Sequence, residues 1–292
     1  MLPSMAEKPT ITIVGAGNLG AALATALRDA GFQIDAVVTR SQGESRARAR
    51  RLAATIQSRV LSHADNIHAS VLWICVPDRA IAQTAASLAD HFHWRGKVAL
   101  HSSGALTSDV LQPLREKGAS VASVHPLMTF VRGSRPSLAG VPFALEGDPR
   151  ALRVARGIVR QLGGKPYSIR KEHKDAYHAW GTFASPLLTA LLATSERVAA
   201  LAGVPPEEAA RRMLPILRQT VSNYGKFGAA HGFSGPIVRG DVATVREHLR
   251  VLQRSPVPQQ VYVALARAAL RYLPAKNKAS LKKALDSVDA RR

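Results

Sequence analysis

Apolar residues follow two different patterns along the chain. Up to about residue 169, short β-rich apolar runs alternate with stretches of helical periodicity. The predicted strands cover residues 10–14, 34–39, 71–76, 97–100, 120–124, 142–145 and 166–169, and the predicted helices cover residues 19–30, 45–56, 79–92, 107–116 and 149–162. Strands that alternate with helices are typical of a parallel sheet with helices on both faces.

Beyond about residue 170, strand patterns largely vanish. Helices are predicted over residues 171–201, 206–227, 242–253, 258–273 and 279–289, and Pro186 and Pro215 should kink or split the first two. We therefore predict an α/β Rossmann domain with a doubly wound, mainly parallel sheet over residues 1–168. An all-α domain over residues 169–292 should follow it.

A glycine motif stands between the first predicted strand and the first predicted helix. Residues 15–20 read G-x-G-x-x-G, in which Gly15 permits a tight turn, Gly17 lets a pyrophosphate approach the backbone, and Gly20 lets the helix pack closely. The helix N-terminus offers free N–H groups to phosphates. We expect the whole motif to bind a dinucleotide, through Gly15, Ala16, Gly17, Asn18, Leu19 and Gly20.

The end of the second predicted strand indicates which dinucleotide binds. NAD-binding proteins place an acidic residue there for the ribose 2′-hydroxyl, whereas this chain has Arg40 and Ser41. A cation and a hydroxyl suit a 2′-phosphate, so the pattern favours NADP over NAD. Arg46 and Arg48 are further candidates for contacts with this phosphate.

Polar residues follow three later strands, where ligands of open parallel sheets bind. Val76, Pro77 and Asp78 end one strand and are expected to border the cofactor. His101 and His125, which end the next two strands, are candidates to protonate a carbonyl that receives a hydride.

Three further side chains are candidates to orient the substrate. Ser102 could bond the cofactor carboxamide or the substrate, Asn223 could orient the substrate from a helix, and Arg239 could clamp a carboxylate or phosphate. His178 opens an apolar helical stretch and is a third candidate proton donor. Each of these histidines could instead hold a turn or fill the core, and their spacing predicts no metal site.

These motifs together resemble a family of bacterial predicted oxidoreductases. The resemblance rests on the glycine motif, His101-Ser102-Ser103-Gly104, His125-Pro126-Leu127, His178 and the loop Gly235–Asp241. Members join a Rossmann-like domain to a C-terminal helical domain of unknown function. More distantly, the chain is similar to pyrroline-5-carboxylate reductase and the 6-phosphogluconate dehydrogenase superfamily.

The resemblance implies NADP-dependent reduction of a small carbonyl or imine, with a 2-oxo acid such as ketopantoate as a candidate substrate. It also implies a homodimer formed through the helical domain. The chain departs from its relatives at Ser185-Pro186, where many have Ser-Asn, and Lys171 comes too early for the catalytic lysine of hydroxyacid dehydrogenases.

Composition restricts the remaining possibilities. The chain has a net charge of +20, which favours an anionic substrate, but its basic residues are spread out and its aromatic content is 5%, so nucleic acid is not the expected partner. No apolar run is long enough to span a membrane, residues 1–10 do not resemble a signal peptide, and a single cysteine is present. These features predict a cytoplasmic protein.

Two other functions stay open beside the reductase. The chain could be a non-catalytic NADP(H)-binding sensor or partner protein, since its motifs lack a complete acid–base signature. It could also associate with nucleic acid through its charge, which a steep salt dependence of binding would reveal.

Overall fold

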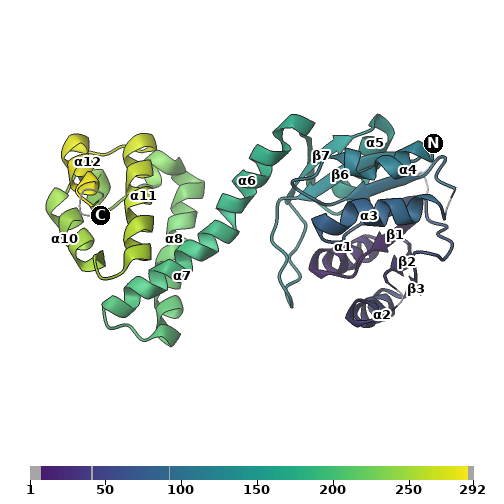
Figure 1. Cartoon of the computed structure of the whole chain (residues 1–292), viewed down its shortest axis with the longest axis horizontal. Coiled ribbons are helices and arrows are strands. Elements are labelled where there is room, and N and C mark those ends of the chain that lie inside the picture. Colours follow the sequence, from purple (N-terminus) through teal and green to yellow (C-terminus); the bar gives the residue numbers. More distant parts are fainter. Residues whose placement is uncertain (1–7, 41, 92, 289–292) are drawn as a thin grey trace, which may run out of the picture. The chain divides into compact units, whose positions relative to one another are not determined.

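The computed structural model describes residues 8–40, 42–91 and 93–288. The described chain forms two compact units, which divide between Thr182 and Phe183 (Figure 1). The first unit therefore extends beyond the predicted domain limit at residues 168 and 169. The physical reason is that the first turns of helix α6 (Lys174–Ala184) place buried side chains against the sheet.

The first unit is built on an eight-stranded sheet in the order β3-β2-β1-β4-β5-β6-β7-β8. The strands are β1 (Ile11–Val14), β2 (Ile34–Val38), β3 (Arg59–Leu61), β4 (Val71–Ile74), β5 (Val98–His101), β6 (Ser120–Pro126), β7 (Pro142–Gly147) and β8 (Lys165–Ser168). All neighbours pair in parallel except β6 and β7, so the predicted mainly parallel, doubly wound sheet is confirmed. The sequence patterns missed β3, which is short and only partly buried.

Helices cover both faces of this sheet. They are α1 (Asn18–Asp29), α2 (Glu44–Ile56), α3 (Asp78–Ala89), α4 (Gln112–Glu116) and α5 (Pro149–Gln161), with short 3₁₀ segments η1 (Ser108–Leu111) and η2 (Lys171–His173). Apolar residues of α1, α2 and α5 pack on one face, and those of α3, η1 and α4 pack on the other.

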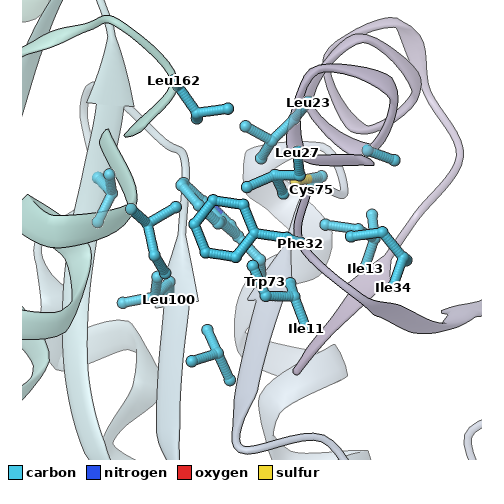
Figure 2. Packing of buried hydrophobic residues seen from close by; sticks show 14 of the residues in the cluster. Ile11, Ile13, Leu23, Leu27, Phe32, Ile34, Trp73, Cys75, Leu100 and Leu162 are labelled. Carbon is cyan, nitrogen blue, oxygen red and sulfur yellow. The ribbon is translucent and has the colours of Figure 1, made fainter. Parts of the chain in front are cut away.

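The core on the α1 face contains side chains from alternate positions of the central strands, because successive residues of a strand point to opposite faces of the sheet. Figure 2 shows Phe32 and Trp73 between Ile11, Leu27 and Leu100 in this core. Trp73 and Leu100 are completely buried. This core fixes the strand ends on which the candidate site is built.

The second unit is helical, as predicted. Its helices are α7 (Pro186–Leu201), α8 (Pro206–Gly232), α9 (Pro236–Arg239), α10 (Val242–Leu252), α11 (Pro256–Tyr272) and α12 (Lys278–Asp286). Its core lies between α10, α11 and α12 and includes Val245, Leu249, Val263 and Leu281.

The two prolines in the first helices of this region behave differently. Pro186 separates α6 from α7, as predicted, because a proline is well accommodated at the first position of a helix. Helix α8 instead continues through Pro215, and the backbone leaves the helical conformation at Gly228, where φ is 73°. Pro215 therefore does not split the helix, although a split was one of the two outcomes predicted for it.

No single helix in the described residues is long and apolar enough to cross a membrane, although one bent pair, residues 171–201 with 206–239, reaches the required length and composition together.

Candidate active site

The glycine motif forms a turn between β1 and α1 that leaves room for a ligand. Gly15 has φ of +100°, and a Cβ there would lie 2.9 Å from the carbonyl oxygen of Cys75. A Cβ on Gly20 would lie 2.1 Å from the carbonyl oxygen of Gly15, so α1 approaches the turn as closely as only glycine allows. Gly17 has open space where its side chain would be. The turn therefore exposes its backbone at Gly17.

A cleft of about 710 Å³ opens beside this turn. Of the predicted cofactor-binding residues, Gly15, Ala16, Gly17, Asn18, Arg40, Val76 and Pro77 line it. Leu19, Gly20 and Asp78 lie next to it, in the first turns of α1 and α3. Ser41 lies outside the described residues.

The cleft suits a dinucleotide with an additional phosphate. No side chain in the described part of the chain caps α1, and its first turn holds no acidic residue, so its N-terminus can receive a pyrophosphate. Arg40, Arg48 and Arg79 line the same cleft. Arg48 contacts Glu44 at 3.2 Å, while Arg40 has no carboxylate partner among the described residues. The residues present therefore fit NADP(H).

The turn after β5 lies next to this cleft and is stabilised by its own serine. The Oγ of Ser103 donates to Asp78, which directly follows Pro77 of the cleft, at 2.7 Å. The same oxygen accepts from the backbone amides of Ala105 and Leu106. This hydroxyl holds the ends of β4 and β5 together.

His101 has a structural role, and its predicted role as a proton donor is wrong. The side chain is completely buried, its Nδ1 accepts from the amide of Ser103 at 3.1 Å, and its Nε2 lies 3.1 Å from the carbonyl oxygen of Thr107. Burial, together with the charge of Lys174, lowers the pKa of His101 to about 3. Neither ring nitrogen is available to a substrate.

Ser102 also points into the core. Its Oγ accepts from the indole nitrogen of Trp73 at 2.8 Å, and the residue is 7% exposed. The predicted contact of this hydroxyl with substrate or carboxamide is not supported, because the hydroxyl is engaged by a buried tryptophan.

His125, in contrast, lies at the open end of β6 among side chains of α6. Its Nδ1 is 2.7 Å from the hydroxyl of Tyr177. A Cβ on Gly104 would lie 2.9 Å from Nε2 of His125 and 2.9 Å from Cδ2 of His178. The turn after β5 thus brings two of the predicted histidines together, with Nε2 of His125 facing Gly104.

Burial, together with the charges of Lys174 and His178, lowers the pKa of His125 to about 4. The imidazole of His125 is therefore neutral at neutral pH, and one of its two nitrogens carries a single proton.

A buried lysine that the sequence patterns did not identify supports this cluster. Lys174 is 1% exposed, and its Nζ donates to the carbonyl oxygen of Ser103 at 3.1 Å and to Oγ of Ser123 at 2.5 Å. Burial lowers the pKa of Lys174 to about 8, although the negative charges of Glu146 and Asp78 act to raise it. Lys174 therefore ties α6 to the ends of β5 and β6.

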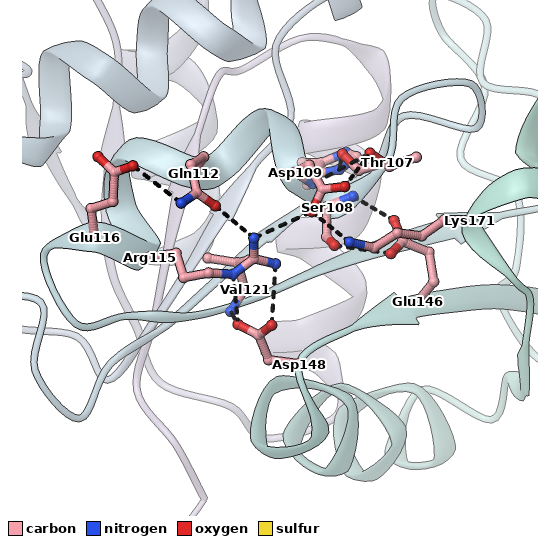
Figure 3. A network of polar contacts seen from close by, with 11 residues as sticks. Thr107, Ser108, Asp109, Gln112, Arg115, Glu116, Val121, Glu146, Asp148 and Lys171 are labelled. Carbon is pink, nitrogen blue, oxygen red and sulfur yellow. Dashed lines mark hydrogen bonds and ion pairs between the residues drawn. The ribbon is translucent and has the colours of Figure 1, made fainter.

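A second polar network fixes the chain just before α6. In Figure 3, Arg115 lies between Asp109 and Asp148, and Lys171 reaches Asp109. Glu146 is 4% exposed and accepts from the backbone amide and the hydroxyl of Ser108. One sequence signal for this network was available, because Glu146 interrupts an otherwise apolar strand.

The two remaining predicted substrate residues belong to the second unit. Asn223 lies in α8 and accepts from the side chain of Gln219 at 2.7 Å, and Arg239 ends α9 and is exposed. The roles of both residues in substrate binding stay predictions. Among the described residues, no cluster of metal-ligating side chains was found.

Both parts of the chain match known protein domains. Residues 5–126 match the Rossmann-like domain, and residues 141–269 match a domain of unknown function, DUF2520. No curated protein matches the chain significantly.

Solved structures share the fold over most of the chain. The Thermotoga maritima protein TM1727 is 26% identical, with a TM-score of 0.70, over 97% of this chain and 100% of that one. A candidate NADP oxidoreductase from Bacteroides fragilis is 23% identical, with a TM-score of 0.75, over 89% and 97% of the two chains.

An enzyme of known activity is more distant. The imine reductase of Myxococcus stipitatus, solved with NADP+, is 18% identical, with a TM-score of 0.63, over 90% of this chain and 94% of that one. The chain therefore joins a Rossmann-like domain to a DUF2520 domain, and it shares its overall fold with these solved structures.

Proposed function

We propose that this protein is an NADP-dependent oxidoreductase that reduces a small, anionic carbonyl or imine compound, with a 2-oxo acid such as ketopantoate as one candidate. The observation that carries the proposal is that the cofactor cleft and the turn beside His125 are joined through neighbouring residues. The cleft lined by Gly17 and Arg40 is also lined by Pro77, and the next residue, Asp78, bonds the turn that faces His125.

The fold likeness supports the choice of cofactor. Solved structures with this fold contain NADP+ or NADPH, including a reductive aminase from Aspergillus terreus. When bound, NADPH supplies a hydride and its electron pair. The chain would hold the pyrophosphate at the N-terminus of α1 and the 2′-phosphate at Arg40 and Arg48.

His125 is the proposed proton donor. Reduction of a carbonyl or imine requires one proton at the oxygen or nitrogen. His125 is partly buried, and its Nε2 faces Gly104 while Nδ1 is held by Tyr177. His178 lies against the same glycine and would border the substrate.

Binding of the cofactor is the first test. We expect NADPH to bind at least tenfold more tightly than NADH (about 1.4 kcal/mol), measured by nicotinamide fluorescence. Arg40→Ala should remove most of this preference and leave NADH binding unchanged. Arg160→Ala, at an exposed arginine of α5 outside the cleft, is the matched control. Equal binding of both nucleotides would contradict the role of Arg40.

Turnover is the second test. The purified protein should oxidise NADPH with a member of a panel of 2-oxo acids and cyclic imines, and His125→Gln should abolish turnover while it keeps NADPH affinity. Tight NADPH binding without turnover across the panel would instead support a non-catalytic NADP(H)-binding protein.

A further inference from the structure

A row of residues crosses the sheet from the candidate proton donor to its edge. His125 of β6 pairs with Ala144 of β7, and Ala144 pairs with Tyr167 of β8. Paired residues on neighbouring strands point to the same face, and each strand step is about 4.8 Å. The small side chain of Ala144 therefore separates an imidazole from a phenol on one face of the sheet.

A second tyrosine joins the two ends of this row. Tyr177 of α6 is 7% exposed, and its hydroxyl lies 2.7 Å from Nδ1 of His125, with the two rings edge to face at 5.4 Å. The phenol of Tyr167 is near enough to interact with that of Tyr177. Tyr167 itself is only partly buried, on the last strand of the sheet.

If His125 donates a proton from Nε2, it needs a group that can supply a proton to Nδ1. Burial and the charge of Lys174 keep this imidazole neutral at neutral pH, so its Nε2 proton is not the surplus proton of an imidazolium. Loss of that proton alone would leave an imidazolate, which is a poor outcome in a buried site. A proton that arrives at Nδ1 in the same step avoids this charge.

We propose that Tyr177 and Tyr167 form a proton relay that resupplies Nδ1 of His125 from the edge of the sheet. The inference rests on the proposed function, in which Nε2 of His125 protonates the substrate. Tyr177 and Tyr167 are positioning residues, because they act through His125 and do not touch the substrate.

The relay balances in protons and charge. As the substrate carbon receives the hydride, its oxygen or nitrogen takes the proton from Nε2 of His125. Nδ1 takes the proton of the Tyr177 hydroxyl, and the Tyr177 oxygen takes the proton of Tyr167. Water then reprotonates Tyr167 at the partly exposed end. His125 finishes as the other neutral tautomer. It returns to the first tautomer when a proton from water reaches Nε2 and the Nδ1 proton passes back through the two tyrosines to water.

The direction of the first hydrogen bond can be tested without cofactor or substrate. In the whole protein, ¹⁵N chemical shifts should show His125 with its proton on Nε2 and a bare, accepting Nδ1, since Tyr177 donates. Tyr177→Phe should shift this population toward the Nδ1-protonated tautomer, and Tyr167→Phe should shift it less. A wild-type His125 with its proton on Nδ1 would overturn the relay.

The chain offers a matched control for this measurement. In the second unit, Nδ1 of His248 lies 3.0 Å from the hydroxyl of Tyr262, with the rings also edge to face. Tyr262→Phe should change the ¹⁵N shifts of His248 and leave those of His125 unchanged. A change at His125 in this variant would show that the readout follows general loosening of the protein, and the result for Tyr177→Phe would then not support the relay.

Kinetics in mixed H₂O and D₂O test the movement of protons once a substrate is known. The wild-type rate should depend on the deuterium fraction in the way expected when more than one proton moves in the same step. Tyr177→Phe should reduce kcat by about 10²-fold and leave the Kd for NADPH unchanged. Its rate should show the dependence expected for a single proton. A one-proton dependence in the wild type would overturn the relay. If no substrate turns over, the proposed function fails, while the tautomer result still decides the hydrogen-bond direction.

Discussion

At the scale of single residues, the site depends on how closely Gly104 lets two imidazoles approach the turn after β5. Any side chain at this position would meet His125 and His178 at 2.9 Å, a distance that real Cβ contacts do not show. Because His125 is also held by Tyr177, its ring cannot move away without a change in that hydrogen bond.

We therefore expect Gly104→Ala to displace His125, to destabilise the protein by about 1–3 kcal/mol and to reduce turnover. NADPH affinity should change little, because Gly104 does not line the cleft. Urea denaturation and fluorescence titration measure the two effects.

Gly157→Ala is the control for this substitution. Gly157 lies inside α5 with open space where a Cβ would be, so alanine should leave stability equal or raise it by about 0.5–1 kcal/mol. Equal stability changes in the two variants would contradict the packing argument.

At the scale of elements, strands β5, β6 and β7 carry polar side chains on one face of the sheet. His101, Ser123 and Glu146 form one row across β5, β6 and β7, and His125 lies in the next row. Residues at every second position of β6 point to this face, where Lys174 of α6 contacts Ser123. Polar groups are thus buried between a sheet and a helix start.

Burial of neutral histidines in these rows should make the protein sensitive to acid. The pKa values of His101 and His125 are lowered from 6.5 to about 3 and about 4, so below pH 6.5 the unfolded chain binds protons that the folded chain does not. The free energy of unfolding should therefore fall as pH drops from 6.5 toward 4, by up to about 1.4 kcal/mol per pH unit for each histidine.

The free energy of unfolding can be measured by denaturation at several pH values in this window, for the wild type and for His101→Asn. The difference between the two proteins gives the part of the pH dependence that is due to His101. The variant should lose stability less steeply with falling pH than the wild type. The exposed His68→Asn variant is the control and should keep the wild-type slope. Identical slopes for wild type and His101→Asn would refute the assignment.

At the scale of the whole molecule, the second unit exposes an unusual amount of apolar surface. No residue of α7 is buried, and Ala209 is the buried residue of α8. Ile216, Val221 and Tyr224 on α8 are each more than 60% exposed. Monomers rarely expose large apolar patches, so we propose that a second copy of the chain covers these helices.

Sedimentation of the full chain should then show a homodimer, and Ile216→Glu should shift it toward monomer because a charge would be buried in the interface. Val131→Glu, at a 58% exposed position of the first unit, should leave the dimer intact. A wild-type monomer at micromolar concentration would argue against this interface.

The sequence by itself determined the local elements and the cofactor motif. Short continuous apolar runs predicted the strands, and the glycine spacing identified the turn at Gly15 to Gly20, because both depend on contacts between near neighbours in the chain. Arg40 could be placed at the cleft for the same reason, since it lies two residues after the end of β2.

Only the tertiary structure decided which polar residues make the candidate site. His101 and His125 look alike in sequence, yet one has both nitrogens bonded to the turn and the other faces Gly104. Lys174 and Tyr177 joined the site because α6 starts against β6, across about fifty residues of chain. Contacts between such distant residues depend on strand order and helix placement, which no local pattern encodes.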